Sequence, residues 1–132
     1  MSTRRSSTGP FELLIFDCDR VLVDSEWIVG RAGFEALQAI GYALSHDLVA
    51  DRFTGVSDRD MRAALEADLG RPLPRSFALD LNRREAALYE RELRPVNGIT
   101  LALAQLPMVK CVASGSTPAT LALKLRSTGL DE

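Results

Sequence analysis

A short apolar run that leads directly into two aspartates constrains the possible folds of this chain more than any other feature of its sequence. Residues 11–16 are nearly all apolar, and Asp17 and Asp19 follow them. A run of this length is typical of a strand buried inside a parallel sheet. Because side chains alternate along a strand, both aspartates are expected to project to the same side where the strand ends. The carboxyl ends of the strands form the edge at which open α/β sheets bind ligands.

A second apolar run, residues 108–113, ends at Ser114 and Gly115. Both expected strands therefore stop at polar, loop-forming residues, and we expect an α/β fold whose ligand edge carries both loops. Two strands are too few to bury the faces of a parallel sheet. The sequence therefore predicts an incomplete core, completed by residues beyond Glu132 or by another chain. It also predicts self-association through the unpaired strand edges.

The segment between the two runs is predicted to be helical. Apolar residues recur there at helical spacing, and glycines and prolines stand where helices would end. Ser57, with Asp60 three residues later, indicates an N-cap, and Thr117 before Pro118 indicates another. Helices are expected over residues 25–40, 57–69, 76–94, 99–106 and 117–128, with Gly41, Gly70, Pro95, Pro107 and Gly129 as their stops.

Composition and charge exclude several functional classes. The formal net charge of −2 leaves no basic footprint for nucleic acid or an anionic membrane surface. No apolar stretch is long enough for a membrane span or a signal-peptide core, so the expected location is the cytoplasm. Cys18 and Cys111 both stand in apolar runs and are expected to be buried in a reducing compartment. Residues 1–10 are polar and are expected to form a flexible tail.

The two aspartates suggest a specific chemistry. Carboxylates crowded at one sheet edge repel each other unless a cation joins them. Mg²⁺ suits such a pair, because it prefers a few carboxylates together with substrate phosphate oxygens. One aspartate could then attack phosphorus while its neighbour moves the proton. The plainer alternative is that Asp17 and Asp19 only cap or turn the chain after a strand, which we would favour for an isolated pair.

The pair is not isolated, because the string FDCDRVLVDSE, residues 16–26, resembles the first motif of the haloacid dehalogenase superfamily. A helical insert follows it, and three later segments also resemble the family: residues 53–57, 94–98 and 112–116. The likeness is strongest to the phosphatase and phosphomutase branch, which carries an all-helical cap. It implies an incomplete Rossmann-like α/β core of about two parallel strands over residues 11–23 and 95–132, with a helical cap over residues 24–94.

The resemblance implies a role for each matching core residue. Asp17 would be the nucleophile and a Mg²⁺ ligand. Asp19 would be the general acid/base, with its backbone carbonyl on the metal. Ser114 would hydrogen-bond the transferring phosphoryl group, helped by the backbone N–H of Gly115.

The resemblance also implies that the cap would determine substrate specificity. Gly55 and Ser57 would lie on a cap turn that faces the substrate, although a turn glycine and an N-cap serine explain these residues at least as well. The implied activity is Mg²⁺-dependent hydrolysis of a small phosphorylated metabolite through an aspartyl-phosphate. Nothing between residues 25 and 94 indicates which metabolite.

One residue departs from the family pattern inside the first motif. The family has glycine where this chain has Arg20. Glycine there indicates backbone torsions or crowding that a side chain would disturb. The arginine could also pair with Asp19, lower its pKa and weaken it as an acid. Alternatively, Arg20 points into solvent and is tolerated; our interpretation favours impaired activity.

The lysine and the later acidic residues of the family motifs normally follow the point at which this chain ends. Lys124 is not expected to replace that lysine, because it falls in the last helix and is predicted on its exposed face. Lys110 lies inside the second strand and fits no better. Phosphoryl transfer depends on positioning and charge stabilisation. The 132-residue chain is therefore predicted to be inactive alone.

Two other functions remain open from the sequence. A sugar phosphomutase would share Asp17 and Asp19, but the mutases of this branch carry a histidine in the core-to-cap linker, near Val29, and the one histidine here is His46. The other is a non-catalytic relic or binding module, which Arg20 and the early end of the chain would favour.

Overall fold

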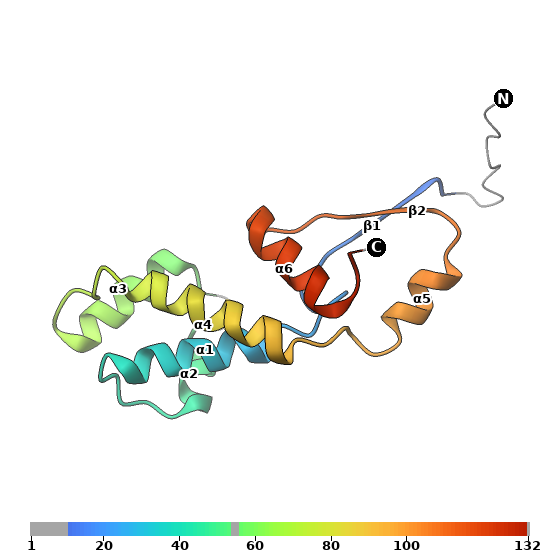
Figure 1. Cartoon of the computed structure of the whole chain (residues 1–132). Helices are drawn as coiled ribbons and strands as arrows, with labels where there is room; N and C mark the ends of the chain where they lie inside the picture. The colour runs from blue at the N-terminus through green and yellow to red at the C-terminus, as the bar shows by residue number, and fades with distance from the viewer. Residues whose placement is uncertain (1–10, 54–55, 132) are drawn as a thin grey trace. The chain divides into compact units, whose positions relative to one another are not determined.

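The computed structural model of the protein describes residues 11–53 and 56–131 (Figure 1). These form two compact units: the described residues up to Ser25 together with those from Glu92 onward, and Glu26–Arg91. The tail predicted over residues 1–10 lies outside the described residues. No helix in the described part of the chain is long and apolar enough to cross a membrane. The elements are β1 (Leu13–Phe16), α1 (Glu26–Ala39), α2 (His46–Phe53), α3 (Asp58–Leu69), α4 (Phe77–Glu92), α5 (Ile99–Gln105), β2 (Val109–Val112) and α6 (Pro118–Thr128).

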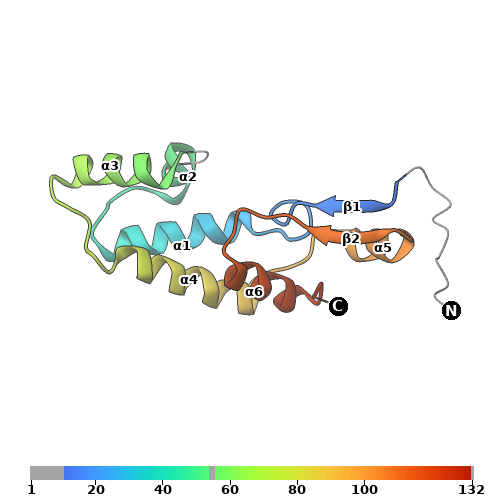
Figure 2. The ribbon, with the colours of Figure 1, turned by 90° about the horizontal axis from the view of Figure 1, so that it is seen from above.

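The first unit is built on two short parallel strands. β1 and β2 pair along their whole length, and Figure 2 shows them side by side. The Ala113 N–H donates to the Phe16 carbonyl at 2.9 Å, which carries the ladder one residue past β2. The loops that begin at Asp17 and Ser114 therefore leave the same edge of the sheet.

One face of this sheet is open, so the prediction of fully buried strands was wrong. Leu13, Ile15 and Val109 are 46%, 63% and 69% exposed, and Cys111 is exposed as well. Paired residues of parallel strands share a face and side chains alternate, so these four residues form one surface, which we call the open face. The prediction of a buried cysteine holds for Cys18 and fails for Cys111, because no layer among the described residues covers the open face.

Helix α6 begins and ends where the sequence predicted. The Thr117 hydroxyl accepts a hydrogen bond from the Thr120 N–H at 3.3 Å, and Pro118 occupies the first turn. Gly129 ends the helix in the left-handed conformation, with φ of 69°. Both ends of the helix are thus fixed by local chemistry.

The second unit is a cluster of four helices around its own apolar core. Helices α1 and α4 lie side by side (Figure 2), and the Arg84 guanidinium of α4 lies 3.6 Å from the Glu35 carboxylate of α1. Helix α2, which the sequence did not predict, contributes Val49 to the core. The buried members of this core are Ala36, Leu37, Tyr42, Val49, Leu65, Leu73 and Phe77.

Capping signals in this unit are confirmed. The Ser57 hydroxyl accepts a hydrogen bond from the Asp60 N–H at 3.2 Å and begins α3. Gly70 ends α3 with φ of 63°, and Gly41 follows α1 with φ of 82°. Positive φ is the reason for glycine at both stops.

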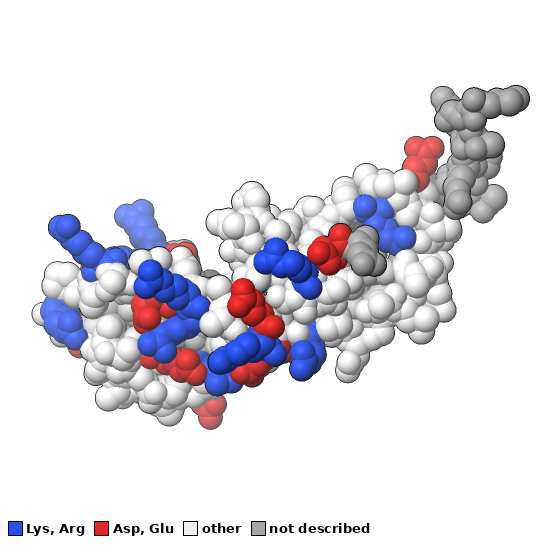
Figure 3. Space-filling view, in the orientation of Figure 1, with Lys and Arg blue, Asp and Glu red and all other residues white. Residues whose placement is uncertain are grey.

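Charged residues of both signs are interspersed on the face that Figure 3 shows. Several are paired one turn apart within a helix, as in Arg31–Glu35 at 3.0 Å and Arg84–Asp80 at 2.9 Å. Pairs at this spacing add modest support to an exposed helix. These charges therefore stabilise the helices that carry them.

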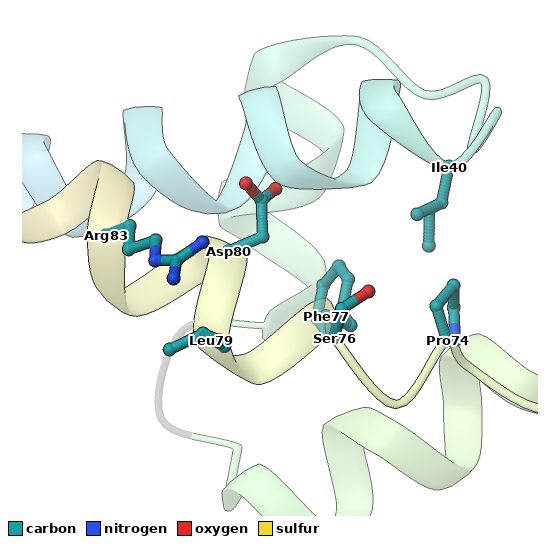
Figure 4. Close-up of a pocket in the computed structure, with 7 residues that line it drawn as sticks. All are labelled: Ile40, Pro74, Ser76, Phe77, Leu79, Asp80 and Arg83. Carbon is teal, nitrogen blue, oxygen red and sulfur yellow. The ribbon is translucent and has the colours of Figure 1, made fainter.

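A pocket of about 230 Å³ lies within the second unit (Figure 4). It opens where α1 ends and α4 begins, and it contains none of the residues predicted to act in chemistry. The residues that line it are Ile40, Pro74, Ser76, Phe77, Leu79, Asp80 and Arg83.

The chain leaves the first unit and returns to it along adjacent paths. The Asp24 N–H donates to the Arg94 carbonyl at 3.0 Å, and the Val96 N–H donates to the Leu22 carbonyl at 2.9 Å. Val23 and Pro95 form an isolated antiparallel bridge between these two bonds. The two linkers are therefore held together by backbone hydrogen bonds.

Candidate active site

A tight backbone loop follows β1. The amides of Leu22 and Val23 donate to the Cys18 carbonyl at 2.9 and 3.1 Å, and the Arg20 N–H donates to the Val23 carbonyl at 2.9 Å. Arg20 has φ of 64°, and it is the one residue other than glycine with positive φ among those the structure describes. This is the torsion that the family glycine would adopt without strain.

Asp17 is the first residue of this loop and is exposed. Its Oδ1 accepts a hydrogen bond from the Cys18 N–H at 2.7 Å. That contact fixes the carboxylate against the backbone. An exposed carboxylate held in this way is accessible to a substrate approaching the sheet edge.

Asp19 is half-buried, and its Oδ1 is held by two donors. The Ser25 hydroxyl donates to it at 2.5 Å, and the Lys124 ammonium donates to it at 2.6 Å. Partial burial raises the pKa of Asp19, but hydrogen bonds from Lys124 and Ser25 and the charge of Lys124 outweigh burial. The charge of Arg20 acts in the same direction, so the pKa lies below its usual range and the carboxylate is ionised.

Lys124 is buried, so its predicted place on the exposed face of the last helix was wrong. Its side chain is 4% exposed. Lys124 lies seven residues after the N-cap Thr117, about two helical turns, and therefore on the same side of α6. Leu121 and Thr128, which share this side, are both half-buried. The helix turns this face inward, and the lysine reaches Asp19.

The loop after β2 joins the same network. Lys124 also donates to the Ser116 hydroxyl at 3.2 Å, and the Ser116 N–H donates to the Ser114 hydroxyl at 3.1 Å. Gly115 is exposed, with open space where a side chain would stand. Predicted residues Asp19 and Ser114 are thus linked through two residues to which the sequence analysis gave no role in the site.

Of the two predicted cap residues, the structure describes Ser57, whose hydrogen bonds lie within the helical unit. Ser57 caps α3, and its hydroxyl also donates to the Asp60 carboxylate at 2.8 Å. Gly55 lies outside the described residues. Contact of either residue with a substrate stays a prediction.

Cys18, between the two aspartates, is not a nucleophile in this arrangement. Burial and the negative charge of Asp19 raise the pKa of its thiol, and the charge of Lys124 offsets only part of this. The reactive form of cysteine is the thiolate. Cys18 therefore packs as a small buried thiol.

The oxygen donors at this edge suit a hard cation. No three side chains of His, Cys, Asp or Glu gather as a metal site within residues 11–53 and 56–131. Mg²⁺ does not require such a cage, because it retains water and binds one or two protein oxygens together with phosphate. Ammonium and hydroxyl donors occupy one oxygen of the Asp19 carboxylate. The Asp17 carboxylate and the Asp19 backbone carbonyl would therefore be the donors for such an ion.

Known proteins share this fold. No protein-family model matches the chain. A structure of a conserved haloacid dehalogenase-like protein of unknown function from Agrobacterium tumefaciens is 31% identical and superposes with a TM-score of 0.75 over 92% of this chain. The chain is similar to haloacid dehalogenase-like proteins in both sequence and fold. The predicted fold class, an α/β core with a helical cap, is therefore confirmed.

Two further relatives of this haloacid dehalogenase-like chain are informative. A haloacid dehalogenase family hydrolase from Deinococcus radiodurans, with bound phosphate and sodium, is 30% identical with a TM-score of 0.70 over 92% of this chain. The 6-phosphogluconate phosphatase of Escherichia coli is 34% identical over 104 residues, 78% of this chain. The chain spans about half of each relative: 55% of the Agrobacterium protein, 54% of the Deinococcus protein and 47% of the phosphatase.

Sequence reasoning missed three members of this haloacid dehalogenase-like site: Ser25, Ser116 and Lys124. For Lys124, helical spacing from the N-cap Thr117 gives its side of α6 but not the burial of that side. Ser25 and Ser116 carry no signal of this kind. Their hydrogen bonds exist because loops distant in sequence meet at the sheet edge.

Proposed function

We propose that the chain supplies the nucleophilic half of a Mg²⁺-dependent phosphomonoester hydrolase. The observation that carries this proposal is the pair of loops at one sheet edge, with the exposed Asp17 carboxylate on one and Ser114 on the other. The likeness to a haloacid dehalogenase family hydrolase and to a phosphatase supports this reaction class. The phosphate bound by the Deinococcus relative supports a phosphorylated ligand.

In the proposed reaction, a carboxylate oxygen of Asp17 attacks phosphorus and the bond from phosphorus to the ester oxygen breaks. Asp19, which is ionised in the site as described, takes up a proton from solvent before this step and gives it to the leaving alcohol. Water then attacks the aspartyl-phosphate and gives a proton to the Asp19 carboxylate, which releases phosphate and restores Asp17. The Ser114 hydroxyl and the Gly115 N–H would donate to the phosphoryl oxygens. Mg²⁺, held by Asp17 and the Asp19 carbonyl, would supply charge neutralisation.

The substrate proposed is a small phosphorylated metabolite. The 6-phosphogluconate phosphatase relative makes 6-phosphogluconate the first compound to test. Its carboxylate and hydroxyl groups would need polar partners outside the phosphoryl site.

The decisive experiment is an assay of phosphate release from p-nitrophenyl phosphate and 6-phosphogluconate, with and without Mg²⁺. It uses the 132-residue chain and the chain lengthened by any residues that its reading frame encodes beyond Glu132. We expect turnover to require Mg²⁺ and to fall at least about 10³-fold in Asp17→Asn, because the nucleophile is lost. Asp24→Asn, an exposed aspartate of the linker, is the matched control and should retain activity. Turnover that survives Asp17→Asn, or no turnover in any form, would refute the proposal.

A further inference from the structure

One of the few lysines of this protein is buried, and its burial needs a physical explanation. The chain has two, Lys110 and Lys124. Lys110 is exposed on β2, whereas Lys124 is 4% exposed. An ammonium group is costly to remove from water unless it is paired and hydrogen-bonded. Lys124 meets this condition through Asp19 at 2.6 Å and Ser116 at 3.2 Å.

These two contacts connect different loops. Asp19 belongs to the loop after β1, and Ser116 belongs to the loop after β2, where its N–H holds the Ser114 hydroxyl. Lys124 itself stands on α6, which begins directly after the second loop. A single ammonium therefore ties the proposed acid/base to the proposed phosphate-binding loop.

We propose that Lys124 is a positioning residue, whose ammonium fixes the Asp19 carboxylate against the loop of residues 114–116. This inference rests on the proposed function for the role of Asp19. Lys124 would act through Asp19 and Ser116, without touching the reacting phosphorus. Its effect would be to hold the two loops in one geometry before a substrate arrives.

Stability alone is a weak explanation for this ion pair. Replacing a buried pair by apolar residues of similar size is often neutral or stabilising. The neighbouring positions Leu121, Leu123 and Leu125 show that α6 accommodates half-buried leucines. Lys124 pairs with Asp19, the half-buried carboxylate at the sheet edge. This contact is better explained by positioning of the Asp19 side chain than by packing of α6.

The first test needs no catalysis. The folded chain is acylated with acetic anhydride, and modification of each lysine is followed by peptide mass spectrometry. We expect Lys110 to react at least about 10-fold faster than Lys124, and Asp19→Asn to remove most of this difference, since the ion pair is lost. Asp24→Asn is the control and should leave the difference unchanged. Equal rates in the wild type, or protection unaffected by Asp19→Asn, would overturn the proposal.

The second test separates positioning from general stability. Amide hydrogen exchange is measured for Lys124→Met, Ser116→Ala and the control Lys110→Met. We expect Lys124→Met to speed exchange at Leu22 and Val23 at least about 10-fold and to leave β1 and β2 within about twofold. Uniform acceleration throughout the unit, or no change in the loop, would overturn the proposal. Should Lys124→Met fail to fold, Ser116→Ala decides, because it removes the contact between Lys124 and Ser116 and should loosen residues 114–116 alone.

The third test uses turnover. Lys124→Met should lower kcat about 10- to 100-fold with KM within about twofold, while Lys124→Arg should recover part of the loss. Lys110→Met should match the wild type. An equal loss in Lys124→Arg and Lys124→Met, or an effect confined to KM, would contradict a positioning role. If no form shows turnover that depends on Asp17, the proposed function fails, and acylation and exchange still decide whether Lys124 holds Asp19.

Discussion

Arg20 holds a left-handed backbone conformation at the centre of the loop that carries both catalytic candidates. Its amide donates to the Val23 carbonyl, and its φ is 64°. For a residue with a Cβ, this conformation costs about 1 kcal/mol relative to glycine. The family resemblance led us to expect a strained backbone at this position. The structure places the strain in the φ torsion of Arg20.

Arg20→Gly should therefore stabilise the protein. Relief of the left-handed strain is partly offset by the greater chain entropy of glycine in the unfolded state, so we expect a net gain below about 1 kcal/mol. The measurement is the free energy of unfolding in urea, followed by circular dichroism. Arg20→Ala is the matched control, since it removes the charge and keeps the strained Cβ. If Arg20→Gly is no more stable than Arg20→Ala, backbone strain is not the cause.

A second residue-scale feature lies in the helical unit. The Tyr42 hydroxyl donates to the Asp68 carboxylate, which also lies 2.7 Å from the Arg52 guanidinium. The hydrogen bond from Tyr42 lowers the pKa of Asp68; desolvation opposes this, and Arg52 adds to it. The folded pKa thus lies below the unfolded one. The stabilisation is present above the unfolded pKa, about 3.9, and is lost as pH falls through the folded pKa.

Asp68→Asn should consequently be less stable than the wild type at pH 7, and the difference should shrink as pH falls below about 3.9. Urea unfolding, followed by the fluorescence of Trp27 in the same unit, would measure it at several pH values. Asp51→Asn, an exposed aspartate of α2, controls for the loss of one negative charge. A difference that stays constant with pH would contradict this account.

At the scale of elements, the ends of helices could be predicted because the causes are local. Thr117, Pro118 and Gly129 each act through their own backbone and near neighbours. Helix α2 was missed, since it is held mainly by the burial of Val49 in a core formed by distant residues. Lys124 was misplaced for a related reason: its burial depends on Asp19, which is far away in sequence.

The cap of α6 is open to a direct test. Thr117→Ala should destabilise the first unit by about 1 kcal/mol, because the Thr120 N–H loses its acceptor. Thr117→Ser keeps a hydroxyl and should lose much less. Thr100→Ala, at an exposed position of α5, is the control and should not destabilise. Thermal unfolding by circular dichroism would rank the variants, and equal losses for Thr117→Ala and Thr117→Ser would exclude a capping role.

On the molecular surface, the open face of the first unit exposes apolar side chains that a folded protein normally buries. Leu13, Ile15 and Val109 present apolar side chains to water there. Apolar patches beside unpaired strand edges favour association. The sequence predicted a sheet with too few strands but gave no measure of which side chains would remain uncovered, because exposure depends on the layers that surround a strand.

We expect the 132-residue chain to self-associate through this face as its concentration rises. Ile15→Lys should weaken the association, because a charge would have to be buried in the contact. Val29→Lys is the matched control, since Val29 is an exposed valine of α1 in the helical unit. Sedimentation velocity over a range of concentrations would measure the effect. A wild-type monomer at every concentration, or an equal effect of Val29→Lys, would contradict the expectation.

The paired linkers have a consequence for how such proteins diversify. Because Asp24 is bonded to Arg94 and Leu22 to Val96, the whole excursion between them starts and finishes at neighbouring points. Its length can then change at little entropic cost to the remainder. The segment between the linkers can therefore be exchanged or resized while Asp17 and Asp19 keep their positions at the sheet edge.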